Sequence, residues 1–178
     1  MSLLEQQNFL ARIFTDENLR RSFWENPEII GKENGLDVED IAQLKEIVAD
    51  DLNYFADSLF HKRLHEVEKL LPLTQKALGE DFSKHFRQFS QNFQSSSVKK
   101  HLEDAIEFCK YMQLQQFEKS YSKDTAKFEQ TKHEFFSLQK HLSGCFLQHD
   151  IFSQTKKISV AVWYRIGTRT CHFILSKI

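Results

Sequence analysis

Two histidines one helical turn apart have the spacing in this 178-residue chain that best suits a metal ion. His61 and His65 would place two imidazoles on one face of a helix, with Asp57 and Glu68 on neighbouring faces. Lys62 stands directly after the first histidine, where the zinc-protease pattern has a glutamate, and its charge would oppose a cation. A solvated helix face is the simpler interpretation. A stand-alone enzyme with a surface metal here is the third of three functional alternatives.

A second group of potential ligands is spread over two predicted helices. It would form a site only if those helices brought its members together, so a solvated surface is again the simpler interpretation. The members are His101, Glu103, Glu107, His133 and Glu134.

The remaining sequence offers few catalytic patterns. Cys109, Cys145 and Cys171 lie far apart and form no CxxC pair, which predicts three small buried residues rather than a disulfide framework or a zinc knuckle. No Gly-rich phosphate loop, GxSxG elbow or Cys–His pair at an informative spacing is visible. The sequence therefore predicts no catalytic residue, no cofactor and no metal in this chain, and no independent enzyme.

Basic residues cluster in the middle of the chain, at Lys84, His85, Arg87, Lys99, Lys100 and His101. A DNA-binding domain usually has a clear excess of basic over acidic residues, whereas residues 51–150 hold fourteen of each. A helical DNA-binding or transcription-regulatory protein is therefore the second functional alternative, and nucleic acid is not the expected partner.

Composition favours a helical protein. A hydrophobic content of 40% is ordinary for a globular chain, and five Gly and two Pro are too few for the turns of an all-β fold. No apolar run approaches the roughly 20 residues that span a bilayer, and residues 1–10 lack the basic start and apolar core of a signal peptide. We expect a cytoplasmic protein with no membrane partner.

The longest helical pattern lies between Asp51 and Phe93. Pro72 should end one long helix and begin a shorter one that closes near Gly79. The predicted buried stripe of the long helix is Leu52, Phe55, Leu59, Leu64, Val67 and Leu71. The helix that follows Gly79 should bury Phe82, Phe86, Phe89 and Phe93.

Shorter patterns complete the helical part. Residues 1–50 predict four short helices, with caps at Thr15 or Asp16, at Asn26 and at Asp37. A long helix should follow the loop Gln94–Ser97, and another should run from about Asp124 to Leu142, after which Ser143–Gly144 ends the helical part.

The last residues change to the alternation of a β-strand. Gly167–Thr168 predicts a type II′ hairpin that pairs Val160 with Leu175 and Val162 with Phe173. A lone hairpin is marginal in water, so it should lie against the helices or gain a third strand. The predicted fold is mainly α, a multi-helix bundle with a small C-terminal antiparallel hairpin or sheet. Its predicted parts are residues 1–50, a helical core at 51–144 and the hairpin at 151–178.

The middle of the chain resembles a known family. Phe60–Leu64 (FHKRL), Leu71–Pro72 and Leu78–Phe82 (LGEDF) are similar to a bacterial helical domain commonly labelled DNA-binding, over roughly residues 50–140. Members of that group accompany multinuclear non-haem iron enzymes that modify cysteines in ribosomally made, copper-binding peptides, as in methanobactin biosynthesis. The resemblance implies a non-catalytic accessory subunit in a heterodimer with such an oxidase, with the iron held by the partner.

The hairpin suggests how such a subunit would hold the precursor peptide. Strand addition takes affinity from main-chain hydrogen bonds, and residues 151–178 carry five basic residues and no acid, which favours an acidic leader peptide. A structural lid that packs Val160, Val162, Phe173 and Leu175 on the helices is the alternative. The predicted peptide-binding residues are Ser159, Ala161, Trp163, Arg165, Arg169, Thr170, His172 and Ile174.

Overall fold

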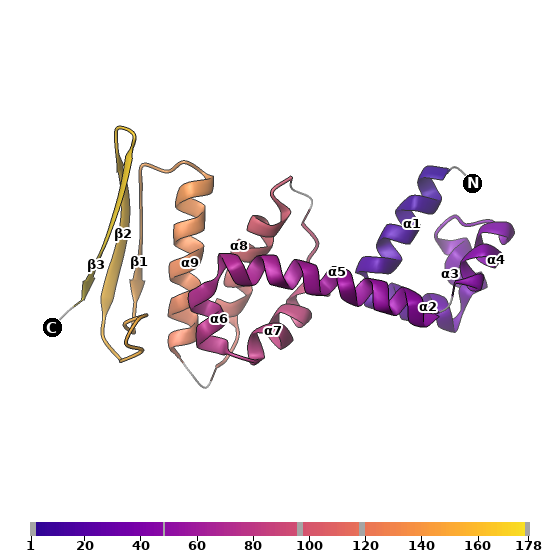
Figure 1. The fold of residues 1–178 in the computed structure, drawn as a ribbon, viewed down its shortest axis with the longest axis horizontal. Helices are drawn as coiled ribbons and strands as arrows, with labels where there is room; N and C mark the ends of the chain where they lie inside the picture. The colour runs from indigo at the N-terminus through magenta and orange to yellow at the C-terminus, as the bar shows by residue number, and fades with distance from the viewer. Residues whose placement is uncertain (1–2, 48, 96–97, 118–119, 177–178) are drawn as a thin grey trace. The chain divides into compact units, whose positions relative to one another are not determined.

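The computed structural model describes residues 3–47, 49–95, 98–117 and 120–176, and it is mainly helical with one small antiparallel sheet near the C-terminus (Figure 1). This confirms the predicted fold class. The chain forms two compact units, Met1–Arg63 and Leu64–Ile178. The finer division into residues 1–50, 51–144 and 151–178 stays a prediction.

The first unit contains the four short helices that its capping residues predict. Asp16 accepts a hydrogen bond from the Leu19 amide at 2.9 Å, and Asp37 and Asp40 form a reciprocal capping box. The helices are α1 (Leu3–Thr15), α2 (Glu17–Glu25), α3 (Pro27–Glu33) and α4 (Val38–Glu46). Their core consists of Phe9, Ile13, Phe23, Leu36 and Ile41, together with Leu52 from the next helix.

The long helix α5 (Ala49–Leu70) buries only part of its predicted stripe. Leu64 and Val67 are buried, but Phe55 is 48% and Leu59 is 37% exposed, so the stripe prediction is wrong at these two positions. A stripe predicted from spacing assumes that other elements cover the helix along its whole length. The buried residues of this helix instead lie near its two ends. The Phe55 ring nevertheless meets the edge of Phe14, with centroids 4.7 Å apart.

The second unit places its helices around a phenylalanine cluster. Pro72 ends α5 as predicted, and Gly79 follows the next helix with a φ of 60° that a side chain would resist. The Phe108 ring contacts Phe82 and Phe86, each at 5.2 Å between centroids. The helices are α6 (Pro72–Leu78), α7 (Asp81–Ser90), α8 (Lys100–Leu114) and α9 (Tyr121–Ser137).

Helix α9 makes hydrogen bonds to the backbone on both sides of the break between α5 and α6. The buried Glu129 carboxylate accepts hydrogen bonds from the Leu73 and Thr74 amides, at 2.8 and 2.9 Å, in the first turn of α6. One turn later, His133 Nε2 donates to the Leu70 carbonyl at 2.7 Å, at the end of α5. These bonds satisfy backbone groups at the end of α5 and the start of α6, which have no partner within their own helix.

The C-terminal sheet has three strands in the order β1-β2-β3. The predicted hairpin register is confirmed, because Val160 pairs with Leu175 and Val162 with Phe173. Gly167 has a positive φ of 59°, as the turn requires. The third strand is the segment after α9. The strands are β1 (Leu142–Leu147), β2 (Ser159–Ile166) and β3 (Arg169–Ser176).

The end of α9 corrects the predicted boundary. The helix stops at Ser137 rather than near Leu142, because Gln139 adopts a left-handed φ of 51°. The Lys140 amide then bonds back to the Phe135 carbonyl at 3.1 Å, which closes the helix and releases the following residues for β1.

Glu129→Gln should lower the free energy of unfolding by about 1–3 kcal/mol, because the Leu73 and Thr74 amides bond different carboxylate oxygens and the variant replaces one of these acceptors with an NH2 group. Chemical denaturation measures this change. Glu66→Gln, which removes an exposed ion pair with Lys69, is the matched control and should leave the midpoint unchanged. An equal loss of unfolding free energy in both variants would contradict a stabilising role for the Glu129 bonds at the α5–α6 break.

His133 should make stability depend on pH. Burial lowers the pKa of His133, although the bond to the Leu70 carbonyl opposes this shift. The unfolded chain therefore binds a proton below its ordinary pKa of about 6.5 while the folded chain does not, and stability falls as pH decreases from about 7 to 5.5. In urea titrations, His133→Gln should reduce that fall. The exposed His141→Gln variant should reproduce the wild-type slope.

Candidate functional site

The sheet packs on α9 through the face opposite to the one that the lid alternative assigns to the helices. Ser159, Ala161 and Trp163 are at most 2% exposed, and the Trp163 ring lies 4.9 Å from that of Phe128. These three residues therefore cannot present side chains to a peptide, which corrects their predicted placement. Large apolar groups occur on both faces of the hairpin, and small Ala161 lets α9 approach closely while Trp163 fills the space between its phenylalanines.

Arg165 also belongs to the covered face. Its guanidinium lies 5.5 Å from the centre of the Phe135 ring on α9, and its amide donates to the His141 carbonyl at 2.9 Å. Strand β2 is paired on both sides, so its backbone offers no free edge to a ligand. The predicted positions whose side chains remain exposed are on β3, namely Arg169, Thr170 and His172. Ile174 is half-buried and packs against the apolar cluster between the sheet and α9, so only its backbone can meet a peptide.

Strand β3 forms one outer edge of the sheet. In a two-residue hairpin the residues that flank the turn exchange both backbone hydrogen bonds, and every second pair along the strands does the same. Ile166 and Arg169 flank the turn, so the N–H and C=O groups of Thr170, His172 and Ile174 point away from β2. The Arg165 amide bonds to the carbonyl of His141, the residue before β1, which agrees with this alternation.

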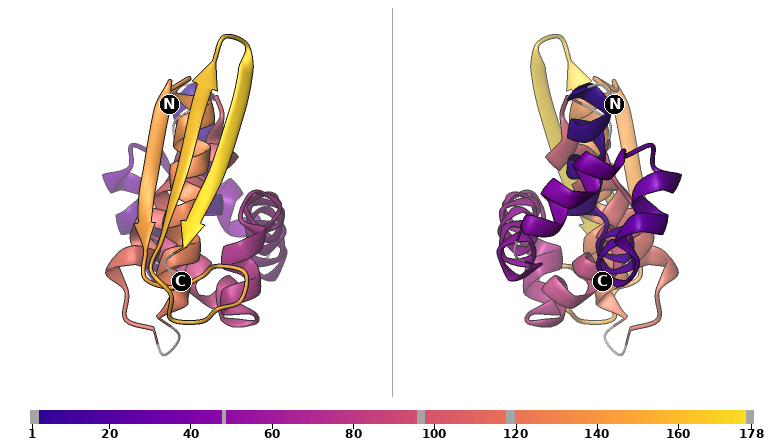
Figure 2. Two further views of the ribbon diagram at one scale, coloured as in Figure 1. Left: turned by 90° about the vertical axis from the view of Figure 1, so that its left-hand side faces the viewer. Right: turned by 90° about the vertical axis from the view of Figure 1, so that its right-hand side faces the viewer.

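The outer face of the sheet is apolar and exposed. In the left view of Figure 2 the strands lie in front of α9, and no described segment of the second unit covers them from that side. Tyr164 and Val162 on β2 are half-buried between their neighbours. The exposed side chains around them are Leu142 (67%), Phe146 (72%), Phe173 (41%) and Leu175 (63%). We call these six residues the outer sheet face.

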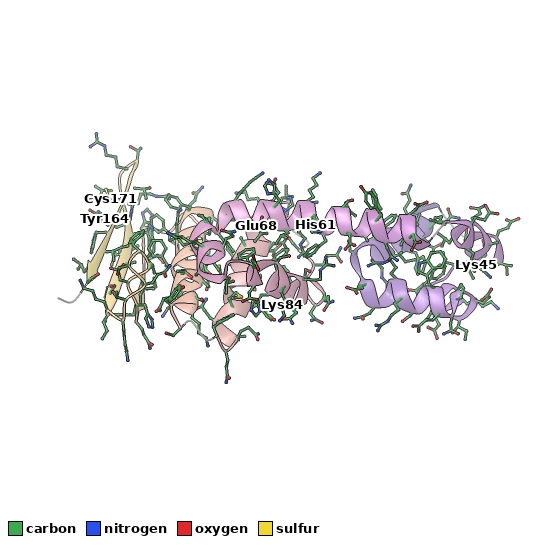
Figure 3. The ribbon with its side chains drawn as sticks, turned by 60° about the horizontal axis from the view of Figure 1, so that its bottom comes forward. Lys45, His61, Glu68, Lys84, Tyr164 and Cys171 are labelled. Carbon is green, nitrogen blue, oxygen red and sulfur yellow. The ribbon has the colours of Figure 1, made fainter. Side chains whose placement is uncertain are left out.

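The histidine pair and the other potential ligands form no metal site in the described part of the chain, although Glu103, Glu107 and Glu134 line one pocket on α8 and α9 together with Lys99 and Lys110. His65 Nδ1 lies 3.8 Å from the Glu68 carboxylate on the exposed surface of α5, and His61 and Glu68 are labelled in Figure 3. Glu134 binds Gln130 and Lys140, while His133 binds the α5 terminus. Within the described residues no three His, Cys, Asp or Glu side chains are placed to hold a metal ion.

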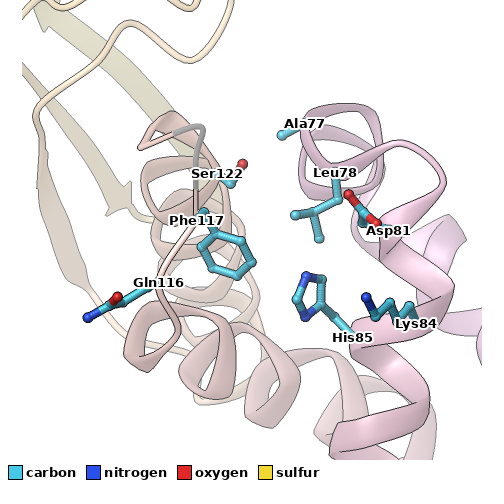
Figure 4. A pocket seen from close by; sticks show the side chains of 8 residues that line it. All are labelled: Ala77, Leu78, Asp81, Lys84, His85, Gln116, Phe117 and Ser122. Carbon is cyan, nitrogen blue, oxygen red and sulfur yellow. The ribbon is translucent and has the colours of Figure 1, made fainter.

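Part of the basic cluster borders a pocket of about 290 Å³ in the second unit (Figure 4). The His85 ring meets the edge of Phe117, with centroids 5.1 Å apart, and burial lowers the pKa of this histidine. Asp81 lines the pocket together with Lys84, so carboxylate and ammonium groups are mixed there. The other lining residues are Ala77, Leu78, Gln116 and Ser122.

A polar cluster that the sequence did not predict lies where α9 begins. Ser120 Oγ is 2.9 Å from Nε2 of His149, and Nδ1 of the same ring is 2.7 Å from Oδ2 of Asp124. No local motif signals it, since Ser120 and Asp124 precede the sheet and His149 follows its first strand. Only the packing of the segment after β1 against α9 brings the three together.

The cysteines differ in exposure. Cys109 and Cys145 are buried as predicted, and burial raises the pKa of both thiols. Cys171 is only partly buried, which corrects the prediction for that residue, and it pairs with Tyr164 across β2 and β3 (Figure 3).

No known family model, curated protein or solved structure matches this chain. Among the described residues, no helix is sufficiently long and apolar to cross a bilayer.

Native protein should react with N-ethylmaleimide at Cys171 first, because Cys109 and Cys145 are buried and rarely form the reactive thiolate. Mass spectrometry should find one fast adduct in buffer and three in denaturant. Fast native modification of Cys109 or Cys145 would contradict the described packing. Cys171 then serves as a reporter beside the outer sheet face.

Proposed function

We propose that this protein is an accessory subunit that holds an acidic peptide as a fourth strand along β3. The observation that carries the proposal is the outer edge of β3, which pairs with no other strand of the described residues and where Thr170, His172 and Ile174 direct backbone donors and acceptors outward. A peptide strand added there would gain main-chain hydrogen bonds and would extend the sheet without rearranging it.

The charge of the segment that contains β3 supports an acidic peptide. Arg169 is exposed at the start of β3, and exposed Lys156 lies in the connection that leads into β2. Residues 151–178 contain no Asp or Glu, so no carboxylate from this segment neutralises them. Such a distribution favours binding of acidic side chains and makes the affinity fall as salt increases.

The outer sheet face gives the peptide a place for its own apolar residues. Alternate side chains of an added strand would point to that face, next to Phe173 and Leu175. Burial of these exposed groups would add apolar contact to the main-chain bonds, at about 25 cal/mol per Å². The expected ligand therefore alternates β-branched or aromatic residues with polar or acidic ones.

The resemblance of residues 50–140 supplies the biological setting of the proposal. The peptide would be the leader of a Cys-containing precursor, and the helices would bind a multinuclear non-haem iron oxidase that carries out the chemistry. A gene for such an oxidase and a short Cys-bearing reading frame beside this gene are the expected genomic neighbours. Their absence would remove this setting but would leave peptide binding by β3 to be measured directly.

Peptide display against the full chain supplies the probe. A library of nine-residue peptides should yield acidic sequences with alternating apolar residues, and fluorescence anisotropy then measures the dissociation constant of a selected peptide. His172→Pro removes an outward amide and keeps the β2–β3 bonds, so the dissociation constant should rise at least about tenfold, which is ~1.4 kcal/mol.

Phe146→Pro is the matched control, because the same alternation directs its amide to the opposite edge of the sheet, on β1, and β2 and β3 separate its side chain from a strand added beside β3. It should leave peptide affinity within about twofold, while circular dichroism shows both variants folded. Enrichment of no peptide, or equal binding by wild type and His172→Pro, would refute strand addition at β3.

A further inference from the structure

The start of α9 holds three side chains in the order serine, histidine, aspartate. The distances are 2.9 Å from Ser120 Oγ to His149 Nε2 and 2.7 Å from His149 Nδ1 to Asp124 Oδ2. His149 is 8% and Asp124 is 7% exposed, whereas Ser120 is open to solvent. A buried carboxylate, an oriented imidazole and an accessible hydroxyl are the parts of a serine nucleophile with its general base.

The hydrogen bonds of Asp124 determine which ring nitrogen carries the proton. Its Oδ2 also accepts the backbone amides of Gln148 and His149, at 3.2 and 3.0 Å, so this oxygen carries no proton. Nδ1 of His149 must therefore be the donor in the bond to Oδ2. In the neutral ring Nε2 is then an acceptor, and the Ser120 hydroxyl donates to it, which is the arrangement needed for proton removal.

The local helix geometry also separates Ser120 from an ordinary capping role. Serine at the N-cap usually has an extended backbone and accepts a bond from an amide two or three residues later. Ser120 has φ −59° and ψ −27°, and its side chain caps no amide of α9. Its hydroxyl instead bonds His149, while the first-turn amides of α9 lie at the same helix end and carry its positive partial charge.

We propose that Ser120 is a histidine-activated nucleophile that cleaves small carboxylic esters. Ser120 and His149 are the catalytic residues, and Asp124 is a positioning residue that fixes the ring and its tautomer. Ser120 directly precedes the first turn of α9, whose positive partial charge favours a developing oxyanion. The inference goes beyond the proposed peptide docking and does not depend on it.

The reaction balances with water as the only co-reactant. Ser120 Oγ forms a bond to the acyl carbon as its proton moves to His149 Nε2, and the ester C–O bond then breaks with transfer of that proton to the departing alcohol. His149 next takes a proton from water, whose oxygen attacks the acyl carbon. The acid leaves as Ser120 recovers its proton.

A fluorophosphonate probe tests the nucleophile on the full chain. Ser120 Oγ should displace fluoride from phosphorus and give one adduct, which peptide mapping places on Ser120. The protein should also hydrolyse p-nitrophenyl acetate, and Ser120→Ala should lower that rate at least about 100-fold. Ser153→Ala, on an exposed serine in the loop before β2, is the matched control and should keep both signals.

Two further variants separate catalysis from a structural role. Asp124→Asn can keep an oxygen for the two backbone amides and the ring, but it removes the negative charge that stabilises the imidazolium formed as Ser120 attacks. Labelling should therefore slow much more than the melting temperature falls. Ser120→Cys should react with iodoacetamide at position 120 faster than Cys171 does, because His149 can take the thiol proton. A folded wild type with no adduct at Ser120 and no esterase rate above Ser120→Ala would overturn the proposal.

Discussion

The packing of the second unit depends on how α9 satisfies the break at Pro72. Glu129 accepts hydrogen bonds from amides in the first turn of α6, and His133 donates one to the Leu70 carbonyl at the end of α5. One helix therefore bonds to the backbone on both sides of the break. The carboxylate lies at a helix N-terminus, where its charge is favoured, but its burial raises its pKa. Because an unpaired buried amide is costly, these bonds fix the position of α9 along α6.

With α9 held there, its remaining surface determines where the sheet lies. Phe128 and Phe135 on this helix meet Trp163, Ala161 and Cys145 in one apolar cluster. The opposite face of the sheet is left open, although it carries Phe146, Phe173 and Leu175. A face of this kind on a small sheet, beside a free strand edge and basic side chains, is the basis of the peptide-docking proposal.

The start of α9 carries a second chemical feature. Asp124 accepts two backbone amides and the His149 ring, and thereby holds the segment after β1 against the helix. The same bonds aim the imidazole at Ser120. The same network thus holds the chain in place and has the geometry of a serine with its general base. Measurements on the variants distinguish these roles, because a structural role changes the melting temperature whereas a catalytic role changes labelling and esterase activity.

The sequence by itself determined the local elements. Proline and cap residues such as Asp16, Asp37 and Pro72 act within one turn, and the Gly167 turn sets the hairpin register, so these features were predictable. It did not determine which sheet face is buried, because both faces carry large apolar groups and the choice depends on the shape of α9. The tertiary structure also decided that residues after Ser137 form a strand. It alone joined Ser120, Asp124 and His149, since contacts between distant segments leave no local periodicity in the sequence.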